Sequence, residues 1–148
     1  MRLEETGTLD ASPAEVWKVV SDPCRIGHLS ELMTVDELEP DTIPEVGARY
    51  RVLLKVGAVP VGGNVEIIEY TPERELAWTT LTGVDHRLRL RLREIDGGDA
   101  EAGTRLVLRF GYDSPGFLGT FADVAAFVPV RSALRDLLDC VVREVEGP

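Results

Sequence analysis

The sequence predicts one α+β domain, residues 1–148, in which a curved seven-stranded antiparallel sheet closes over a long C-terminal helix. Three observations predict it: a capped pair of short helices near the N-terminus, a central run of alternating apolar and polar residues, and a return to helical spacing at the end. No repeat or linker composition divides the chain, and 148 residues is a common size for a single domain. We therefore expect one core.

A strong helix start follows the first predicted strand, residues 2–10. Ser12 is suited to cap the free N–H groups of the first turn, and Glu15 completes a capping box. Asp22-Pro23 then interrupts this helix, because the residue before a proline is displaced from helical conformations. A second short helix is expected from residue 23 to about residue 32.

The middle of the chain alternates apolar and polar residues with a period of two, which is typical of strands with one buried face. The predicted strands cover residues 33–39, 46–56, 62–71, 75–82, 84–95 and 104–112. Short segments rich in Gly, Pro and Asp separate them and favour antiparallel neighbours.

The clearest alternation lies in residues 84–95, where His86 and three leucines alternate with Arg87, Arg89, Arg91 and Arg93. We expect the arginines, with Arg105 and Arg109 alongside, to form the solvated outer face of the sheet and to pair with acids across strands. The alternative interpretation is a basic patch for phosphates, which the net charge of −10 disfavours.

Helical spacing returns in residues 116–146, with an apolar stripe along one face. Pro129 falls inside this segment and removes one backbone hydrogen bond, so a kink or break is expected there. For the core, we expect burial of Trp17, Leu54, Leu88, Leu90, Leu106, Leu108, Phe121 and Leu137, and exposure of Arg87, Arg89, Arg91 and Arg93.

Composition narrows the range of partners. A net charge of −10 repels nucleic acid and anionic lipid surfaces at long range. No stretch approaches the ~20 apolar residues of a membrane span, and the N-terminus lacks a secretory h-region, so a cytoplasmic location is expected. The two cysteines and two histidines show no metal-ligand spacing, and there is no phosphate-cradling glycine loop. We expect no metal and no cofactor; a homodimer is compatible with the sequence.

Two stretches resemble a known superfamily. Residues 9–17, with Ser12-Pro13 and Val16-Trp17, followed by Asp22-Pro23, are similar to an opening "A-S-P-x-x-V-W" helix ended by "D-P". Residues 69–78 are similar to a "P-x-R-x-L-x-aromatic" hairpin. Both are features of the SRPBCC superfamily, which includes START lipid-binding domains, birch-pollen-allergen-like proteins and polyketide cyclases. The resemblance covers nearly the whole chain and implies a helix-grip fold that encloses a cavity.

Several side chains in the inward phase are candidates for a site. His86 is the candidate catalytic residue, since a neutral imidazole can exchange protons near neutral pH; the alternative is a structural histidine at a strand end. The residues expected to line an apolar ligand cavity are Tyr50, Tyr70, Trp78, His86, Phe110, Tyr112, Phe117 and Phe121, with core packing as the alternative. Glu66 shares a strand with apolar neighbours in both phases, and a solvated position is favoured for it.

Three functions from different classes follow as hypotheses. The first is binding of an apolar or aromatic small molecule, such as a lipid, polyketide or isoprenoid, in the cavity. The second is a polyketide cyclase or aromatase in which polar cavity residues transfer protons. The third is a protein-interaction module. Whether the protein is an enzyme is left open, because a fold of this kind serves unrelated chemistries.

Overall fold

Seven strands and three helices are found in the described part of the chain. The computed structural model describes residues 1–55, 61–96, 102–113 and 119–147, with the backbone alone for residues 61 and 119–127. The strands are β1 (Arg2–Leu9), β2 (Met33–Glu37), β3 (Arg49–Leu54), β4 (Val61–Thr71), β5 (Glu75–Thr80), β6 (Asp85–Ile95) and β7 (Gly103–Asp113). The helices are α1 (Pro13–Val20), α2 (Pro23–Leu29) and α3 (Gly119–Glu146).

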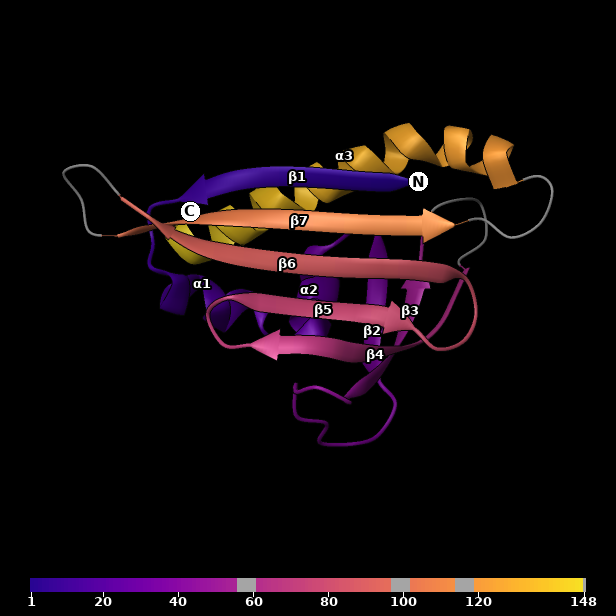
Figure 1. Ribbon diagram of the computed structural model, residues 1–148, viewed down its shortest axis with the longest axis horizontal. Coiled ribbons are helices and arrows are strands. Elements are labelled where there is room, and N and C mark those ends of the chain that lie inside the picture. Colours follow the sequence, from indigo (N-terminus) through magenta and orange to yellow (C-terminus); the bar gives the residue numbers. More distant parts are fainter. Residues whose placement is uncertain (56–60, 97–101, 114–118, 148) are drawn as a thin grey trace.

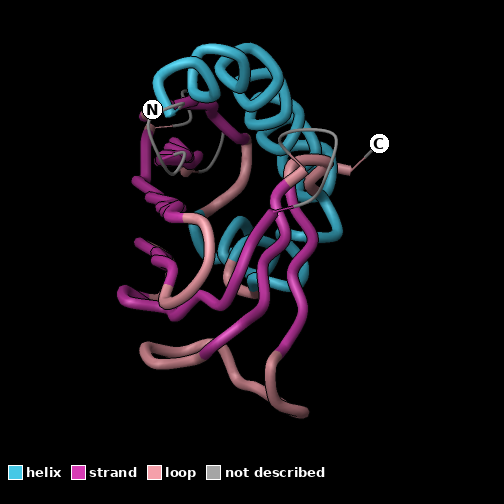
Figure 2. The backbone as a smooth tube through the Cα atoms, turned by 90° about the vertical axis from the view of Figure 1, so that its right-hand side faces the viewer, coloured by secondary structure: helices cyan, strands magenta, loops and turns pink. Residues whose placement is uncertain are grey.

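The strands form a single sheet in the order β1-β7-β6-β5-β4-β3-β2, and every neighbouring pair is antiparallel. Figure 1 shows β1, β7 and β6 running along the length of the molecule, with β2 and β3 turned across them. In Figure 2 the sheet bends round, with the helices on its concave side. The predicted helix-grip fold is confirmed.

The two short helices begin where the sequence predicts. The Ser12 side chain accepts the backbone N–H of Glu15 at 3.3 Å and caps α1. The Glu15 carboxylate accepts from the Ser12 hydroxyl, so the second half of the expected capping box is replaced by a side-chain contact. Asp22 caps α2 by accepting from Cys24 N–H at 3.0 Å. The predicted end of α2 near residue 32 is wrong, because Ser30 is already extended and its hydroxyl accepts from the N–H of Leu32.

Glycines permit the tight curl where β4 begins. A Cβ atom at Gly62 would lie 1.9 Å from the carbonyl oxygen of Val52 on β3, and one at Gly63 would lie 2.0 Å from that of Thr82. No side chain can be accommodated at either distance, so both positions require glycine. The backbone of β4 is thereby held closely between β3 and the segment that follows β5.

A β-bulge in β4 explains why both phases of this strand carry apolar residues. The pairing with β5 shifts between Ile67 and Glu69, which leaves Ile68 as the extra residue, 43% exposed. Before the bulge Val65 and Ile67 are buried; after it Tyr70 lies opposite buried Leu76. One inserted residue therefore moves Tyr70 into the inward phase.

Helix α3 is attached to the inner side of β1 by a close contact and an ion pair. Gly7 lacks a side chain where the Leu138 methyl groups come within 3.0 Å of an ideal Cβ position. The half-buried Glu5 carboxylate accepts from Arg131 at 3.3 Å and from Arg135 at 3.0 Å, one helical turn apart. The helix runs without a break through Pro129, which is exposed. The expected break is therefore absent.

The core lies between the concave face and the helices. Of the side chains expected to be buried, Trp17, Leu54, Leu88, Leu90, Leu106, Leu108 and Leu137 all are. The side chain of Phe121 lies outside the described residues. Arg87, Arg91 and Arg93 are exposed, as predicted. Arg89 is only partly exposed, because it forms an ion pair with Glu75 on the neighbouring β5.

Leu90 gives the test of this packing. It is 1% exposed and lies between Leu76 and Leu108 in the ladder, so Leu90→Ala removes buried methyl groups and leaves a cavity. We expect the free energy of unfolding to fall by ~2–5 kcal/mol in urea denaturation. The control is Arg93→Ala on the exposed face of the same strand, expected to change it by less than ~0.5 kcal/mol. Equal effects of the two changes would contradict the assigned strand phase.

Candidate functional site

His86 lies near the start of β6 on the concave face. Its backbone pairs with Tyr112 of β7, and it shares the inward phase with Leu88 and Leu90. The side chain is fully buried, and its ring stacks on Phe110 with a centroid separation of 6.0 Å and an interplanar angle of 30°. Burying an imidazole away from solvent costs free energy unless both of its nitrogens form hydrogen bonds.

One nitrogen of His86 has a partner, and this fixes where the proton sits. The indole Nε1–H of Trp78 donates to His86 Nε2 at 3.2 Å. Because indole only donates, Nε2 must be the unprotonated acceptor, and the neutral ring therefore carries its proton on Nδ1. That Nδ1–H is buried and has no hydrogen-bond partner among the described residues. The Val84 backbone contributes a hydrogen-bonding influence that raises the pKa of the ring, so this donor is poorly satisfied rather than wholly free.

Burial keeps this imidazole neutral. Loss of solvation lowers the pKa of His86 from 6.5 to about 4, while the Val84 backbone and the Asp85 carboxylate act in the opposite direction. A proton on Nε2 would also point directly at the indole N–H of Trp78 and repel it. The hydrogen-bond geometry and the loss of solvation therefore both favour the neutral imidazole. At neutral pH His86 is a hydrogen-bond donor and a weak base.

Tyr50 contributes a second unsatisfied polar atom. It lies on β3, its side chain is fully buried, and its hydroxyl has no partner among the described residues. Desolvation, followed by the charge of Asp22, raises the pKa of Tyr50, so the hydroxyl stays protonated. It can therefore donate to a ligand oxygen or accept from a ligand hydroxyl.

The remaining predicted site residues fall into two groups. Trp78, Phe110 and Tyr112 are buried on the concave side, and the half-buried Tyr70 ring lies 5.2 Å from that of Trp17. Phe117 and the side chain of Phe121 lie outside the described residues. The cavity expected over these rings therefore stays a prediction. Glu66 forms an ion pair with Arg49 at 3.2 Å, consistent with the favoured solvated position.

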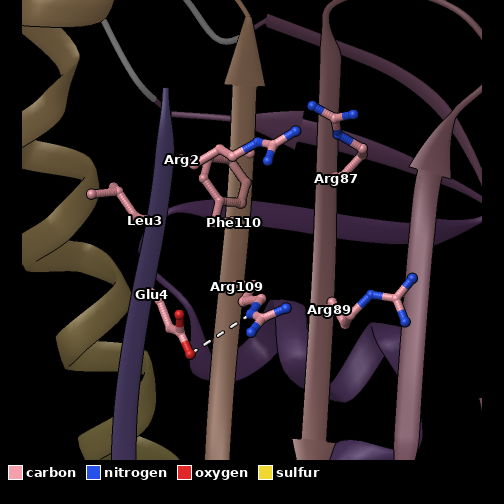
Figure 3. A pocket seen from close by; sticks show the side chains of 8 residues that line it. Arg2, Leu3, Glu4, Arg87, Arg89, Arg109 and Phe110 are labelled. Atoms are coloured by element: carbon pink, nitrogen blue, oxygen red, sulfur yellow. Dashed lines mark ion pairs between the residues drawn. The ribbon is translucent and has the colours of Figure 1, made fainter.

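A hollow of about 450 Å³ opens on the opposite, convex face of the sheet (Figure 3). Its lining includes Arg2, Glu4, Arg87, Arg89 and Arg109. Arg2 and the neighbouring Gly111 were not among the residues that the sequence predicted for a site. The signal available was a glycine in the outward phase of β7, two residues after the outward Arg109.

The described residues contain neither a metal-binding cluster nor a helix that could span a membrane. No group of three or more His, Cys, Asp or Glu side chains is placed there to hold a metal ion. None of the described helices combines the length and apolar character needed to cross a bilayer.

Comparison with known families identifies the chain's relatives. Residues 1–146 match the family described as "Polyketide cyclase / dehydrase and lipid transport". The chain belongs to this family. The SRPBCC resemblance is thereby confirmed. No curated protein gives a match.

Solved structures show the same fold at low sequence identity. A Thermus thermophilus protein has a TM-score of 0.77 at 14% identity, covering 99% of this chain and 98% of its own. A Streptomyces protein, the Zhui aromatase/cyclase, has a TM-score of 0.72 at 21% identity, covering 99% and 93%. A Deinococcus radiodurans protein has a TM-score of 0.71 at 19% identity, covering 100% of both chains. These identities establish the fold alone.

The depressed pKa of His86 predicts a pH dependence of stability. Below pH 6.5 His86 becomes protonated in the unfolded chain, whereas in the folded chain it stays neutral down to about pH 4. The free energy of unfolding should therefore fall as pH drops through this window, by up to ~3 kcal/mol from this group, and be unaffected by it above pH 6.5.

The measurement is urea denaturation of the protein and of His86→Gln across this range. The variant should show a shallower loss of stability, because its side chain does not titrate. The exposed His28 provides the control, and His28→Gln should retain the full slope. Identical slopes for the protein and His86→Gln would show that His86 is not buried as a neutral ring.

Proposed function

We propose that the protein binds an apolar or aromatic small molecule that carries at least one oxygen atom, between the concave face of the sheet and α3. The observation that carries this proposal is the pair of buried, unpartnered polar atoms, His86 Nδ1 and the Tyr50 hydroxyl. Leaving such a group unsatisfied costs about 1–3 kcal/mol. Proteins keep few of them, and a ligand oxygen would satisfy each one.

The surroundings favour an apolar ligand body. The His86 ring lies against Phe110 and Trp78, and the concave face is otherwise composed mainly of buried leucine, isoleucine and valine side chains. Such surfaces bind by removal of apolar area from water, at ~25 cal/mol per Å². The polar atoms would set the ligand's orientation. The family description, which includes lipid transport, supports a hydrophobic cargo, and we place this activity in the cytoplasm.

A matched pair of probes tests the role of His86. Acetylnaphthalene and ethylnaphthalene have similar shapes, but only the ketone accepts a hydrogen bond. We expect the protein to bind the ketone more tightly and His86→Leu to lose about tenfold in affinity for the ketone, equivalent to one hydrogen bond. The same variant should bind the hydrocarbon equally or more tightly. Fluorescence titration measures both.

Tyr50→Phe supplies an independent readout, since it removes only the hydroxyl. Without ligand it should be as stable as the protein or slightly more so, because a buried unsatisfied group is deleted. Failure of the protein to bind either naphthalene, together with no ligand mass in native mass spectrometry of freshly purified protein, would overturn the proposal. The protein-interaction hypothesis would then replace it.

A second candidate function is a polyketide cyclase or aromatase, and the donor character of His86 is the observation that favours it. An N–H aimed at a ketone oxygen would stabilise the negative charge that develops there during enolisation or aldol closure. The pKa of about 4 makes the neutral ring a poor general base, so the proton acceptor would be another group. The aromatase/cyclase among the structural neighbours makes this chemistry worth testing.

Turnover of a β-keto substrate separates the two candidates. If the protein is a cyclase, His86→Leu should abolish turnover while the free energy of unfolding above pH 6.5 falls by no more than about 1–3 kcal/mol, the cost of leaving the Trp78 indole N–H without its acceptor. The contribution of His86 to the rate should be constant between pH 5 and pH 8, because the neutral form persists throughout. Absence of turnover with intact ketone binding would leave the binding function alone.

A further inference from the structure

The convex face of the sheet carries a concentration of positive charge that the proposed cavity function does not use. Seven arginines project from the outer side of three adjacent strands: Arg2 of β1, Arg87, Arg89, Arg91 and Arg93 of β6, and Arg105 and Arg109 of β7. The whole chain has a net charge of −10. The outer side of these strands is therefore more positive than the chain as a whole.

The strand register sets like charges against one another. Arg89 lies directly opposite Arg109, and Arg93 lies directly opposite Arg105. Like charges in directly opposite positions destabilise a sheet. A solvated surface does not require this arrangement, because polar uncharged residues would serve equally well.

The acids nearby leave much of the arginines' hydrogen-bonding capacity unused. Glu75 accepts from both Arg89 and Arg91. The closest ion-pair approaches of Arg87 to Asp113 and of Arg109 to Glu4 are both 3.7 Å, too long for hydrogen bonds. Arg2 forms no ion pair with any described residue, and Arg93 and Arg105 likewise have none. Guanidinium donors are thus available.

Four of these arginines surround the hollow of about 450 Å³. Gly111 forms part of its lining, and in the register it lies between Arg2 and Arg87. Figure 3 shows Arg2 reaching from β1 across β7, and Arg109 extending from β7 toward β6. The absence of a side chain at Gly111 leaves space between guanidinium groups from three strands. The lining, with Glu4, carries a charge of +3, and the adjacent acids Glu75 and Asp113, which pair with Arg89 and Arg87, reduce the local charge to +1.

We propose that this hollow is a second binding site, which takes the phosphate groups of a small, water-soluble anionic ligand. Guanidinium groups bind phosphate through paired N–H donors, and several on one concave site give geometric selectivity. The volume is that of a small-molecule site rather than of a single oxyanion, which favours a phosphate ester or diphosphate.

The net negative charge of the chain favours a small ligand over an extended anionic surface. A membrane or an acidic protein surface would also meet the rest of a chain whose net charge is −10, and repulsion would offset the attraction of the arginines. A small anion senses mainly the charges within a Debye length, about 8–10 Å at physiological salt, where the arginines dominate.

The test is calorimetric titration of the full chain with inorganic pyrophosphate. We expect saturable one-to-one binding, weakened at least tenfold by the double variant Arg2→Ala/Arg87→Ala. The matched control is Arg105→Ala, on the same face of β7 but outside the hollow, which should weaken binding less than twofold. Equal losses at Arg87 and Arg105 in single variants would show general charge attraction and overturn the proposal.

A variant that keeps every charge gives a stricter test. In Gly111→Val the three atoms nearest to the added Cβ belong to the flexible end of Arg87, at 3.5 Å or more, so the fold should be retained, as circular dichroism can show. We expect pyrophosphate binding to weaken at least fivefold because the hollow is filled. Unchanged binding in a folded Gly111→Val protein would overturn the site. So would the absence of pyrophosphate binding, or tighter binding to phosphatidylglycerol vesicles or to a hexaglutamate peptide.

Discussion

The two-faced alternation of β6 is the constraint on which the rest of the structure depends. Its inward residues, from His86 to Leu92, are buried, while its outward residues are arginines, so a shift of one residue in register would bury the charges. The cost of that error fixes the pairing of β6 with both β5 and β7. Through those partners it also fixes which side of the sheet receives the helices. Both proposed sites depend on this one register.

The two faces differ in how they treat polar groups. On the concave face a few polar atoms are buried with incomplete partners, in low dielectric, where each missing hydrogen bond is costly. On the convex face many charged groups are exposed, where screening makes each pair weak. The concave site would therefore select a ligand by shape and one or two hydrogen bonds. The convex hollow would select by charge and by the arrangement of guanidinium groups.

A β-bulge and several glycines determine how the sheet curves and which side chains face its concave side. The bulge at Ile68 turns Tyr70 inward. Gly62 and Gly63 allow the curl, and Gly7 lets α3 approach β1. A regular, flat sheet from the same strands would not form a closed concave face. Each irregularity depends on a residue without a side chain or on one residue too many, a common device in curved sheets.

The sequence by itself determined the order of elements, the buried phase of most strands and the inward position of His86, because period and turn chemistry are local properties. It also carried the family resemblance in residues 9–17 and 69–78. The tertiary structure alone decided that Trp78 donates to His86 and that the Tyr50 hydroxyl lacks a partner among the described residues, because both depend on side-chain positions across paired strands and in the packed core. The same holds for the convex hollow: Arg2 and Gly111 lie more than a hundred residues apart and become neighbours only through the pairing of β1 with β7.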